Sequence, residues 1–224
     1  MTSAIVLLHG LARTHLSMRK LEAYLKEQGY TVLNLHYPSR KYPLEELARS
    51  LESELAELPD SLEELFLVTH SLGALVGRLV MAQNPSLPWS RAVFLAPPSG
   101  GSKVARTIES HPVFGSLYRL FYGPAGMEVM QTELELPVPL CSFGVIAGTV
   151  GKSLSNPTSW LSRHQILAEE ESDGTLSVQE TRLEGMDDFV SVEADHTTIM
   201  NHPPTFPLVL RFLQTGCFLE PDTA

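Results

Sequence analysis

The most reactive pattern in the sequence surrounds Ser71. The hexapeptide Val68-Thr69-His70-Ser71-Leu72-Gly73 joins one apolar run to the next. Its spacing matches G-x-S-x-G, with Thr69 in place of the first glycine. In this pattern a sharp strand-to-helix turn strains the serine backbone and exposes a hydroxyl that can attack a carbonyl carbon. Because serine is also a common helix N-cap, the hexapeptide alone leaves a catalytic and a structural interpretation open.

A second pattern could stabilise the charge that such an attack creates. The run Leu7-Leu8-His9-Gly10-Leu11 ends in His-Gly, and Gly10 lets the backbone turn the N–H of Leu11 toward the serine. The N–H of Leu72, at the start of the following helix, would be the second donor of an oxyanion hole. We expect the side chain of His9 to be buried and bonded to backbone.

A serine nucleophile also needs a base, and an imidazole suits neutral pH. Of the eight histidines, His196 follows the late apolar run 189–192 and precedes the last predicted helix. His202 is the second candidate. It lies beside Pro203-Pro204 and is typical of a helix entry.

The predicted acid is Asp173, which lies in the turn Ser172-Asp173-Gly174-Thr175. The chain order Ser71, Asp173, His196 is nucleophile, acid, base, which is the order of one triad-bearing fold and of neither other common one. An aspartate directly beside the histidine is less suitable, because adjacent side chains usually diverge. The alternatives, in order, are Asp195, Asp187 and Asp188.

Strands and helices that could position these residues alternate along the first half of the chain. Continuous β-branched runs predict strands over 4–8, 31–35, 65–68, 92–95, 140–147 and 189–192. Apolar spacing predicts helices over 18–25 with a stop at Gly29, over 44–58 after Pro43, over 72–82 as a buried helix, and over 208–213. The alternation predicts a three-layer α/β/α sandwich around a doubly wound, mostly parallel sheet.

The segment 97–139 differs from the rest because it is rich in glycine, proline and aromatic residues. It begins beyond the carboxyl end of a strand, where ligand crevices form in such sheets. We expect a small cap-like excursion there, within a single domain spanning 1–224. Its side chains either line an apolar acyl pocket or pack a small satellite core. The candidate pocket residues are Phe114, Tyr118, Phe121, Tyr122 and Met127.

Composition excludes several function classes. The 224 residues carry 16 Lys+Arg and 26 Asp+Glu, a net charge of −10, which argues against nucleic-acid binding and against charge-driven docking on anionic lipid. No targeting segment or membrane span is visible, which predicts a cytoplasmic protein. Gly151-Lys152-Ser153 lacks the earlier glycine of a phosphate loop, and Glu169-Glu170-Glu171 lacks the spacing of a calcium loop. We therefore predict no metal and no cofactor.

Together these residues resemble an α/β-hydrolase, through the His9-Gly10 loop, the Ser71 elbow, Asp173-Gly174-Thr175 and Asp195-His196-Thr197-Thr198. The resemblance is closest to small bacterial lipases and esterases, including the group related to GPI-inositol deacylases. It implies a Ser71-His196-Asp173 triad with the Leu11 and Leu72 amides as oxyanion hole. It also implies that two opening strands of the usual fold are trimmed.

The resemblance implies a serine esterase or lipase that cleaves a small-molecule ester, with an apolar acyl group, through an acyl-enzyme. Thioesterase, amidase or acyltransferase activity on the same triad is the enzymatic alternative. A non-catalytic binding protein on the same scaffold is the other alternative, since a fold does not fix a function.

Overall fold

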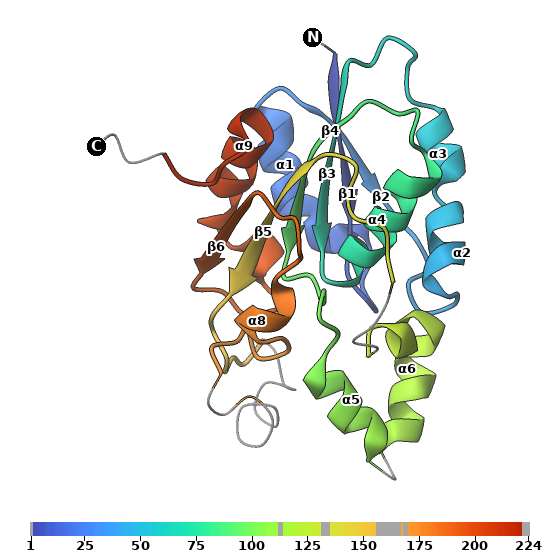
Figure 1. The fold of residues 1–224 in the computed structure, drawn as a ribbon, viewed down its shortest axis with the longest axis vertical. Coiled ribbons are helices and arrows are strands. Elements are labelled where there is room, and N and C mark those ends of the chain that lie inside the picture. The colour runs from blue at the N-terminus through green and yellow to red at the C-terminus, as the bar shows by residue number, and fades with distance from the viewer. Residues whose placement is uncertain (1, 112–113, 131–134, 156–166, 168–169, 221–224) are drawn as a thin grey trace.

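A computed structural model describes residues 2–111, 114–130, 135–155, 167 and 170–220. Its centre is a six-stranded sheet in the order β2-β1-β3-β4-β5-β6 (Figure 1), and every neighbouring pair is parallel. This arrangement confirms the predicted fold class. The strands are β1 (Ser3–Leu8), β2 (Thr31–Leu35), β3 (Glu64–His70), β4 (Trp89–Leu95), β5 (Ser142–Gly148) and β6 (Asp188–Val192).

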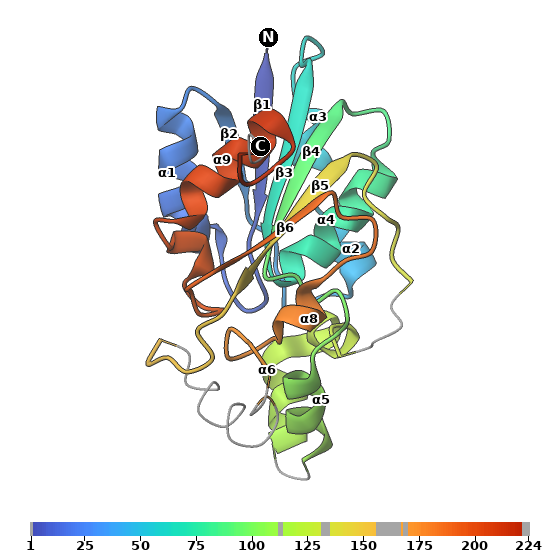
Figure 2. The same cartoon turned by 60° about the vertical axis from the view of Figure 1, so that its left-hand side comes forward.

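Helices cover both faces of the sheet, as Figure 2 shows. On one face α1 (Arg19–Glu27) and α9 (Thr205–Thr215) bury Leu21, Leu25 and Phe212 against the strands. On the other face lie α2 (Leu44–Arg49), α3 (Glu52–Ala56) and α4 (Leu72–Gln83). The central strands are therefore buried on both sides, which explains their continuous rather than alternating apolar sequence.

The predicted helix over 44–58 is two helices. Its apolar stripe is confirmed, because Leu44, Leu47, Leu51 and Leu55 are all buried. Its continuity is wrong, since α2 ends at Arg49 and α3 begins at Glu52. The hydroxyl of Ser50 donates to the carbonyl of Leu47 at 2.7 Å, a local bond of the kind by which serine competes with regular helix.

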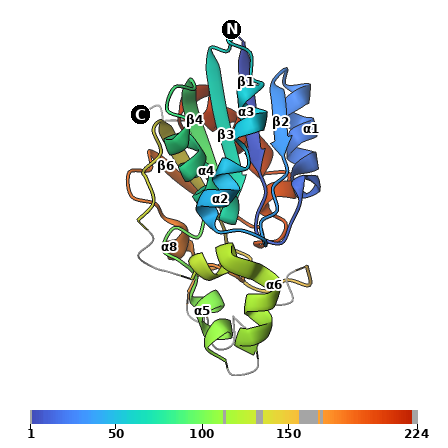
Figure 3. The same cartoon turned by 90° about the vertical axis from the view of Figure 1, so that its right-hand side faces the viewer.

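Two helices, α5 (Lys103–Ser110) and α6 (Phe114–Glu128), stand beyond the carboxyl ends of the strands (Figure 3). We call this pair the cap helices. The α6 ribbon kinks at Gly123, where φ is 65° and a Cβ would lie 1.8 Å from the carbonyl oxygen of Arg40. The Glu128 carboxylate accepts a 2.7 Å hydrogen bond from the N–H of Leu44 and so joins the cap to α2.

Two short helices lie near the carboxyl edge of the sheet, and each follows a loop of the candidate site. They are α8 (Val178–Thr181) and the 3-10 helix η2 (Ile199–Asn201), while a second 3-10 helix, η1 (His15–Met18), leads into α1. None of the helices in the described ranges combines the length and apolarity needed to cross a membrane.

Candidate active site

Ser71 occupies the turn between β3 and α4, and its backbone is strained. Its φ of 52° and ψ of −123° lie outside the regions that a residue with a side chain normally adopts. The side chain makes no N-cap hydrogen bond to the helix that follows. The side chain of Ser71 therefore does not act as a helix N-cap. The turn presents the hydroxyl to a cavity instead.

Glycines of α4 make this sharp turn possible. A Cβ on Gly73 would lie 2.6 Å from the carbonyl oxygen of Leu8, so the helix approaches β1 more closely than any side chain would permit. One turn later, a Cβ on Gly77 would lie 3.2 Å from the Cγ2 methyl of Thr69. The missing side chain at Gly77 leaves room for Thr69 at the position where the usual pattern has glycine.

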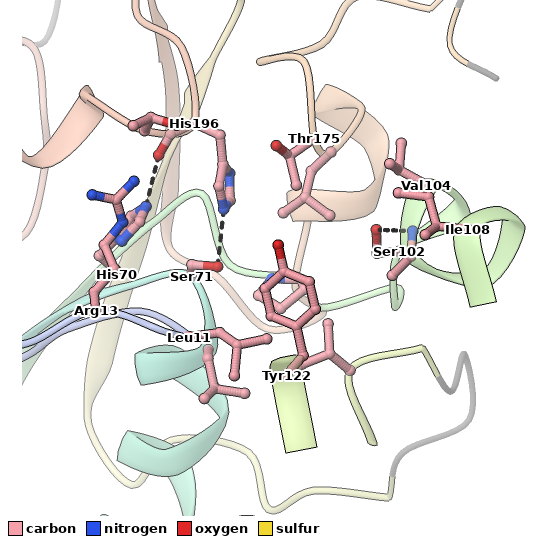
Figure 4. A pocket seen from close by; sticks show the side chains of 16 residues that line it. Leu11, Arg13, His70, Ser71, Ser102, Val104, Ile108, Tyr122, Thr175 and His196 are labelled. Atoms are coloured by element: carbon pink, nitrogen blue, oxygen red, sulfur yellow. Dashed lines mark hydrogen bonds between the residues drawn. The ribbon is translucent and has the colours of Figure 1, made fainter. Parts of the chain in front are cut away.

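Ser71, His196 and Asp173 form a hydrogen-bonded chain. The Ser71 hydroxyl lies 3.0 Å from Nε2 of His196, and Nδ1 of His196 lies 2.7 Å from a carboxylate oxygen of Asp173 (Figure 4 shows the first contact). Since a carboxylate only accepts, Nδ1 carries the proton and Nε2 is free to accept the serine proton. The side chain of Asp173 is 1% exposed and that of His196 is 13% exposed.

Asp173 is held in place by its own turn and by the histidine loop. Its other carboxylate oxygen accepts the N–H groups of Thr175 at 2.9 Å and Leu176 at 2.8 Å. Its carbonyl accepts the N–H of His196 at 3.0 Å, so the loops that carry Asp173 and His196 are bonded through the backbone as well. Gly148, at the end of β5, permits this approach, because a Cβ there would lie 2.9 Å from the Cβ of Asp173.

The alternative acids are engaged elsewhere. Asp195 accepts the hydroxyls of Ser153 and Ser155 and the N–H groups of Thr197 and Thr198. Burial raises the pKa of Asp195, but these hydrogen bonds outweigh it and hold the pKa below its usual value. Asp187 accepts the N–H of Phe143, and Asp188 accepts those of Phe189 and Phe218. The alternative base, His202, follows η2 and its carbonyl accepts the N–H of Thr205, as expected for a helix entry.

Leu11 and Leu72, the expected oxyanion donors, both line the cavity beside Ser71. Leu72 is the first residue of α4, so its N–H has no partner within the helix. Gly10 lies against the elbow, because a Cβ there would lie 3.2 Å from the Cβ of Ser71. The two N–H groups therefore come from two different elements beside Ser71, the loop after β1 and the first residue of α4.

His9 packs beneath the loop that follows β1, as expected for a buried residue bonded to backbone. Its Nδ1 donates to the carbonyl of Gly10 at 2.9 Å, and its Nε2 accepts the N–H of Tyr37 at 3.4 Å. The Tyr37 hydroxyl donates to the carbonyl of His9, and the two rings stack with centroids 4.3 Å apart. Burial lowers the pKa of His9 to about 4, so the ring is neutral at pH 7.

His70 has a role that sequence reasoning missed. Its ring is buried, and its Nε2 donates a 2.9 Å hydrogen bond to the backbone carbonyl of His196. Burial, together with the neighbouring His196 ring and Arg13 guanidinium, holds the pKa of His70 well below its usual value. A Cβ on Gly10 would lie 2.8 Å from the Nδ1 of His70, so the ring also fills the space that this glycine leaves.

A cavity of about 180 Å³ opens over Ser71 and His196. Of the expected pocket residues, Tyr122 lines it, whereas Phe121 and Met127 lie elsewhere. Phe121 is 52% exposed and stacks against the Arg40 guanidinium, while Met127 packs in a satellite cluster with Ala105 and Met130. Both expectations, a pocket and a satellite core, thus describe part of the cap. The side chains of Phe114 and Tyr118 lie outside the described residues.

The other lining residues were not singled out from the sequence, because they come from separate loops and helices. Several are apolar residues, and four are polar. They are Arg13, Pro98, Ser102, Val104, Ala105, Ile108, Val129, Thr175, Leu176 and Thr197. Within the described ranges, no group of three His, Cys, Asp or Glu side chains could hold a metal ion.

The chain belongs to the α/β hydrolase family, whose sequence model matches residues 5–201. This match covers the elbow, the predicted acid and the predicted base. The protein is therefore a hydrolase by family and by fold. No curated protein matches the sequence.

Among solved structures, the mature lipase BlEst2 of Bacillus licheniformis superposes with a TM-score of 0.70 at 19% identity, covering 94% of this chain and 91% of that one. The metagenomic carboxyl esterase MGS0156 gives 0.65 at 18% identity, covering 88% and 65%. The phospholipase PlaB of Legionella pneumophila gives 0.67 at 17% identity, covering 96% and 59%. The chain thus spans about two thirds or less of the last two proteins, and at these identities the likeness establishes the fold.

Proposed function

We propose that the protein is a serine esterase or lipase that cleaves a carboxylic ester through an acyl-enzyme intermediate. The observation that carries the proposal is the chain of contacts from Ser71 through His196 to Asp173, at 3.0 and 2.7 Å. The strained backbone of Ser71 supports it, because such strain is concentrated at functional turns.

In the proposed reaction His196 accepts the proton of the Ser71 hydroxyl as the oxygen attacks the ester carbonyl. The N–H groups of Leu11 and Leu72 stabilise the oxyanion of the tetrahedral intermediate. His196 then donates the proton to the departing alcohol, and water releases the acyl group by the same steps in reverse. Asp173 keeps the imidazole in the tautomer that can accept this proton, and stabilises the imidazolium.

The cavity supports an acyl group of limited size. Its volume of about 180 Å³ is below the range of roughly 300–1,000 Å³ that holds a drug-sized ligand. Apolar side chains of α5, Val104 and Ile108, line one side of it. We propose that the cap helices form a small cap over the acyl group of a short-chain ester. The place within the lipase group related to GPI-inositol deacylases and the cytoplasmic location stay predictions.

Two measurements test the proposal. A fluorophosphonate probe should label Ser71, because only an activated serine reacts with it, and the S71A variant should remain unlabelled. Hydrolysis of p-nitrophenyl butyrate should fall to near background in S71A, with unfolding by urea unchanged. Labelling without turnover of esters, thioesters or amides would point to another acyl acceptor. Retained hydrolysis in S71A, or no labelling of the wild type, would contradict the proposal.

A further inference from the structure

Arg13 places a positive charge in the wall of the cavity. It lies two residues beyond Leu11, in the loop that follows β1, and it lines the cavity together with Ser71 and His196. Among the described lining residues no other is Lys or Arg, and none is Asp or Glu. A chain with 26 acidic and 16 basic side chains has thus put a cation, and no carboxylate, in the wall of its candidate active site.

The Arg13 guanidinium has no anionic partner in the described part of the chain. The charge of Asp195 raises the pKa of Arg13, but no ion pair joins the two side chains in the described residues. The carboxylate of Asp195 is already bonded to two hydroxyls and two amides. No described group accepts a hydrogen bond from the guanidinium. Burial lowers the pKa of Arg13, yet an arginine stays charged at any pH at which a protein works.

A half-buried guanidinium without a partner is suited to an anion. Its planar fork of N–H groups matches two oxygens of a carboxylate or a phosphate, and such charge-assisted bonds are about twice as strong as neutral ones. His70 beside it is neutral and already donates to a carbonyl, so it does not compete for the anion.

The position of Arg13 indicates which part of an ester would carry the anion. In Figure 4 Arg13 lies on the same side of Ser71 as His70, and Val104 and Ile108 lie on the opposite side. The apolar side fits the acyl chain, which leaves the alcohol part toward Arg13. We propose that Arg13 binds a negatively charged group, a phosphate or a carboxylate, in the alcohol part of the substrate. This inference rests on the proposed ester hydrolysis.

Three butyryl esters that differ only in the alcohol test the proposal. They are the esters of glycerol 3-phosphate, of lactate and of glycerol, the last of which is neutral. The measured quantity is the ratio of kcat/KM for each anionic ester to that for the glycerol ester. We expect a ratio of about 10 to 100 in the wild type. The anionic ester with the higher ratio identifies the group that Arg13 binds.

Three variants assign the ratio to Arg13. R13M should bring it close to 1, and R13K should keep part of it, because the charge remains while the planar fork is lost. R19M is the matched control, since Arg19 is exposed at the start of α1 and its loss changes the net charge equally. R19M should keep the wild-type ratio.

A second readout does not depend on turnover. Glycerol 3-phosphate or lactate should slow fluorophosphonate labelling of Ser71 in the wild type and not in R13M. A wild-type ratio near 1, or a ratio that R13M leaves unchanged, would overturn the role of Arg13. Hydrolysis of the glycerol ester that is lost in S71A would then still support the proposed function. If none of the three esters is cleaved while p-nitrophenyl butyrate is, the role of Arg13 fails and the proposed ester hydrolysis stands; if p-nitrophenyl butyrate is not cleaved either, both proposals fail.

Discussion

The ring of His70 donates a hydrogen bond to the backbone carbonyl of His196, at 2.9 Å and across 126 positions of the chain. One histidine thereby holds the loop of the other against the elbow that carries Ser71. The two rings lie with centroids 5.1 Å apart. A buried side chain outside the proposed triad thus helps to position His196 relative to Ser71.

This contact gives a first prediction. H70L replaces the imidazole donor with an apolar side chain, so the His196 loop loses its hydrogen bond to the elbow. We expect kcat to fall by about 3- to 10-fold, the equivalent of one neutral hydrogen bond, with a smaller change in KM. H70Q, whose amide can donate from a similar position, should restore part of kcat. Equal kcat values in H70L and H70Q, at equal stability, would show that the bond does not position His196.

Replacing each acid separately tests the assignment of Asp173. D173N should lower kcat by about 10⁴-fold, as in the worked serine protease case, because the amide no longer holds the required tautomer of His196. D195N changes the neighbouring acid, whose carboxylate is bonded to two serines and two amides. It should lower kcat by less than about tenfold. Steady-state kinetics on p-nitrophenyl butyrate measure both. The reverse order of effects would make Asp195 the acid.

The close approach of α4 to β1 predicts a large cost for a single methyl group. In G73A the added Cβ would meet the carbonyl oxygen of Leu8 at 2.6 Å, and backbone there cannot move aside easily. We expect a loss of about 1–3 kcal/mol in the free energy of unfolding. G100A is the control, because its Cβ would make ordinary contacts at 3.6 Å with Glu180. Urea denaturation of both variants measures the difference, and equal stabilities would refute the steric argument.

The buried imidazole of His9 predicts acid sensitivity. Its pKa is lowered from 6.5 to about 4 in the folded protein. Between these two pH values the unfolded chain therefore binds a proton that the folded chain does not bind. The contribution of the neutral His9 to the free energy of unfolding is complete above pH 6.5 and is lost as the pH falls from 6.5 toward 4. The slope within that window is up to about 1.4 kcal/mol per pH unit.

Urea denaturation at pH 7.5, 6 and 5 tests this window, with H9N as the variant. An asparagine does not titrate, so H9N should show a shallower loss of stability between pH 6.5 and 5 than the wild type. Parallel curves for the two proteins would mean that His9 does not titrate as its burial predicts. His70, whose pKa is lowered for the same reason, adds to the loss in both proteins.

The central strands were predictable because each is covered on both faces. Runs such as Ala4-Ile5-Val6-Leu7-Leu8 carry no charge and are rich in β-branched and other apolar residues, which is typical of strands in a buried parallel sheet. The split between α2 and α3 was not predictable from apolar spacing, because the stripe continues through the break. At the break the hydroxyl of Ser50 bonds to a carbonyl, a local contact that has no periodic signal.

Some residues of the candidate site were likewise predictable from the sequence, and others were not. Ser71 and His196 were found from local patterns, a turn before a buried helix and a histidine after a late strand. His70 and Arg13 were not found, since what distinguishes them is a contact or a cavity formed with segments far away in the chain. The sequence signals that could have pointed to them are the place of His70 directly before Ser71 and that of Arg13 two residues beyond Leu11.

The strands that carry Ser71 and His196 differ in their position in the sheet. Ser71 follows β3, which has a neighbour on each side, whereas His196 follows β6, which in the described sheet pairs with β5 alone. An outer strand opens more readily than a central one, and opening it would carry the base away while the rest of the sheet stays paired. Because His196 is the base of the proposed reaction, we expect mild denaturant to abolish ester hydrolysis before circular dichroism detects any loss of structure.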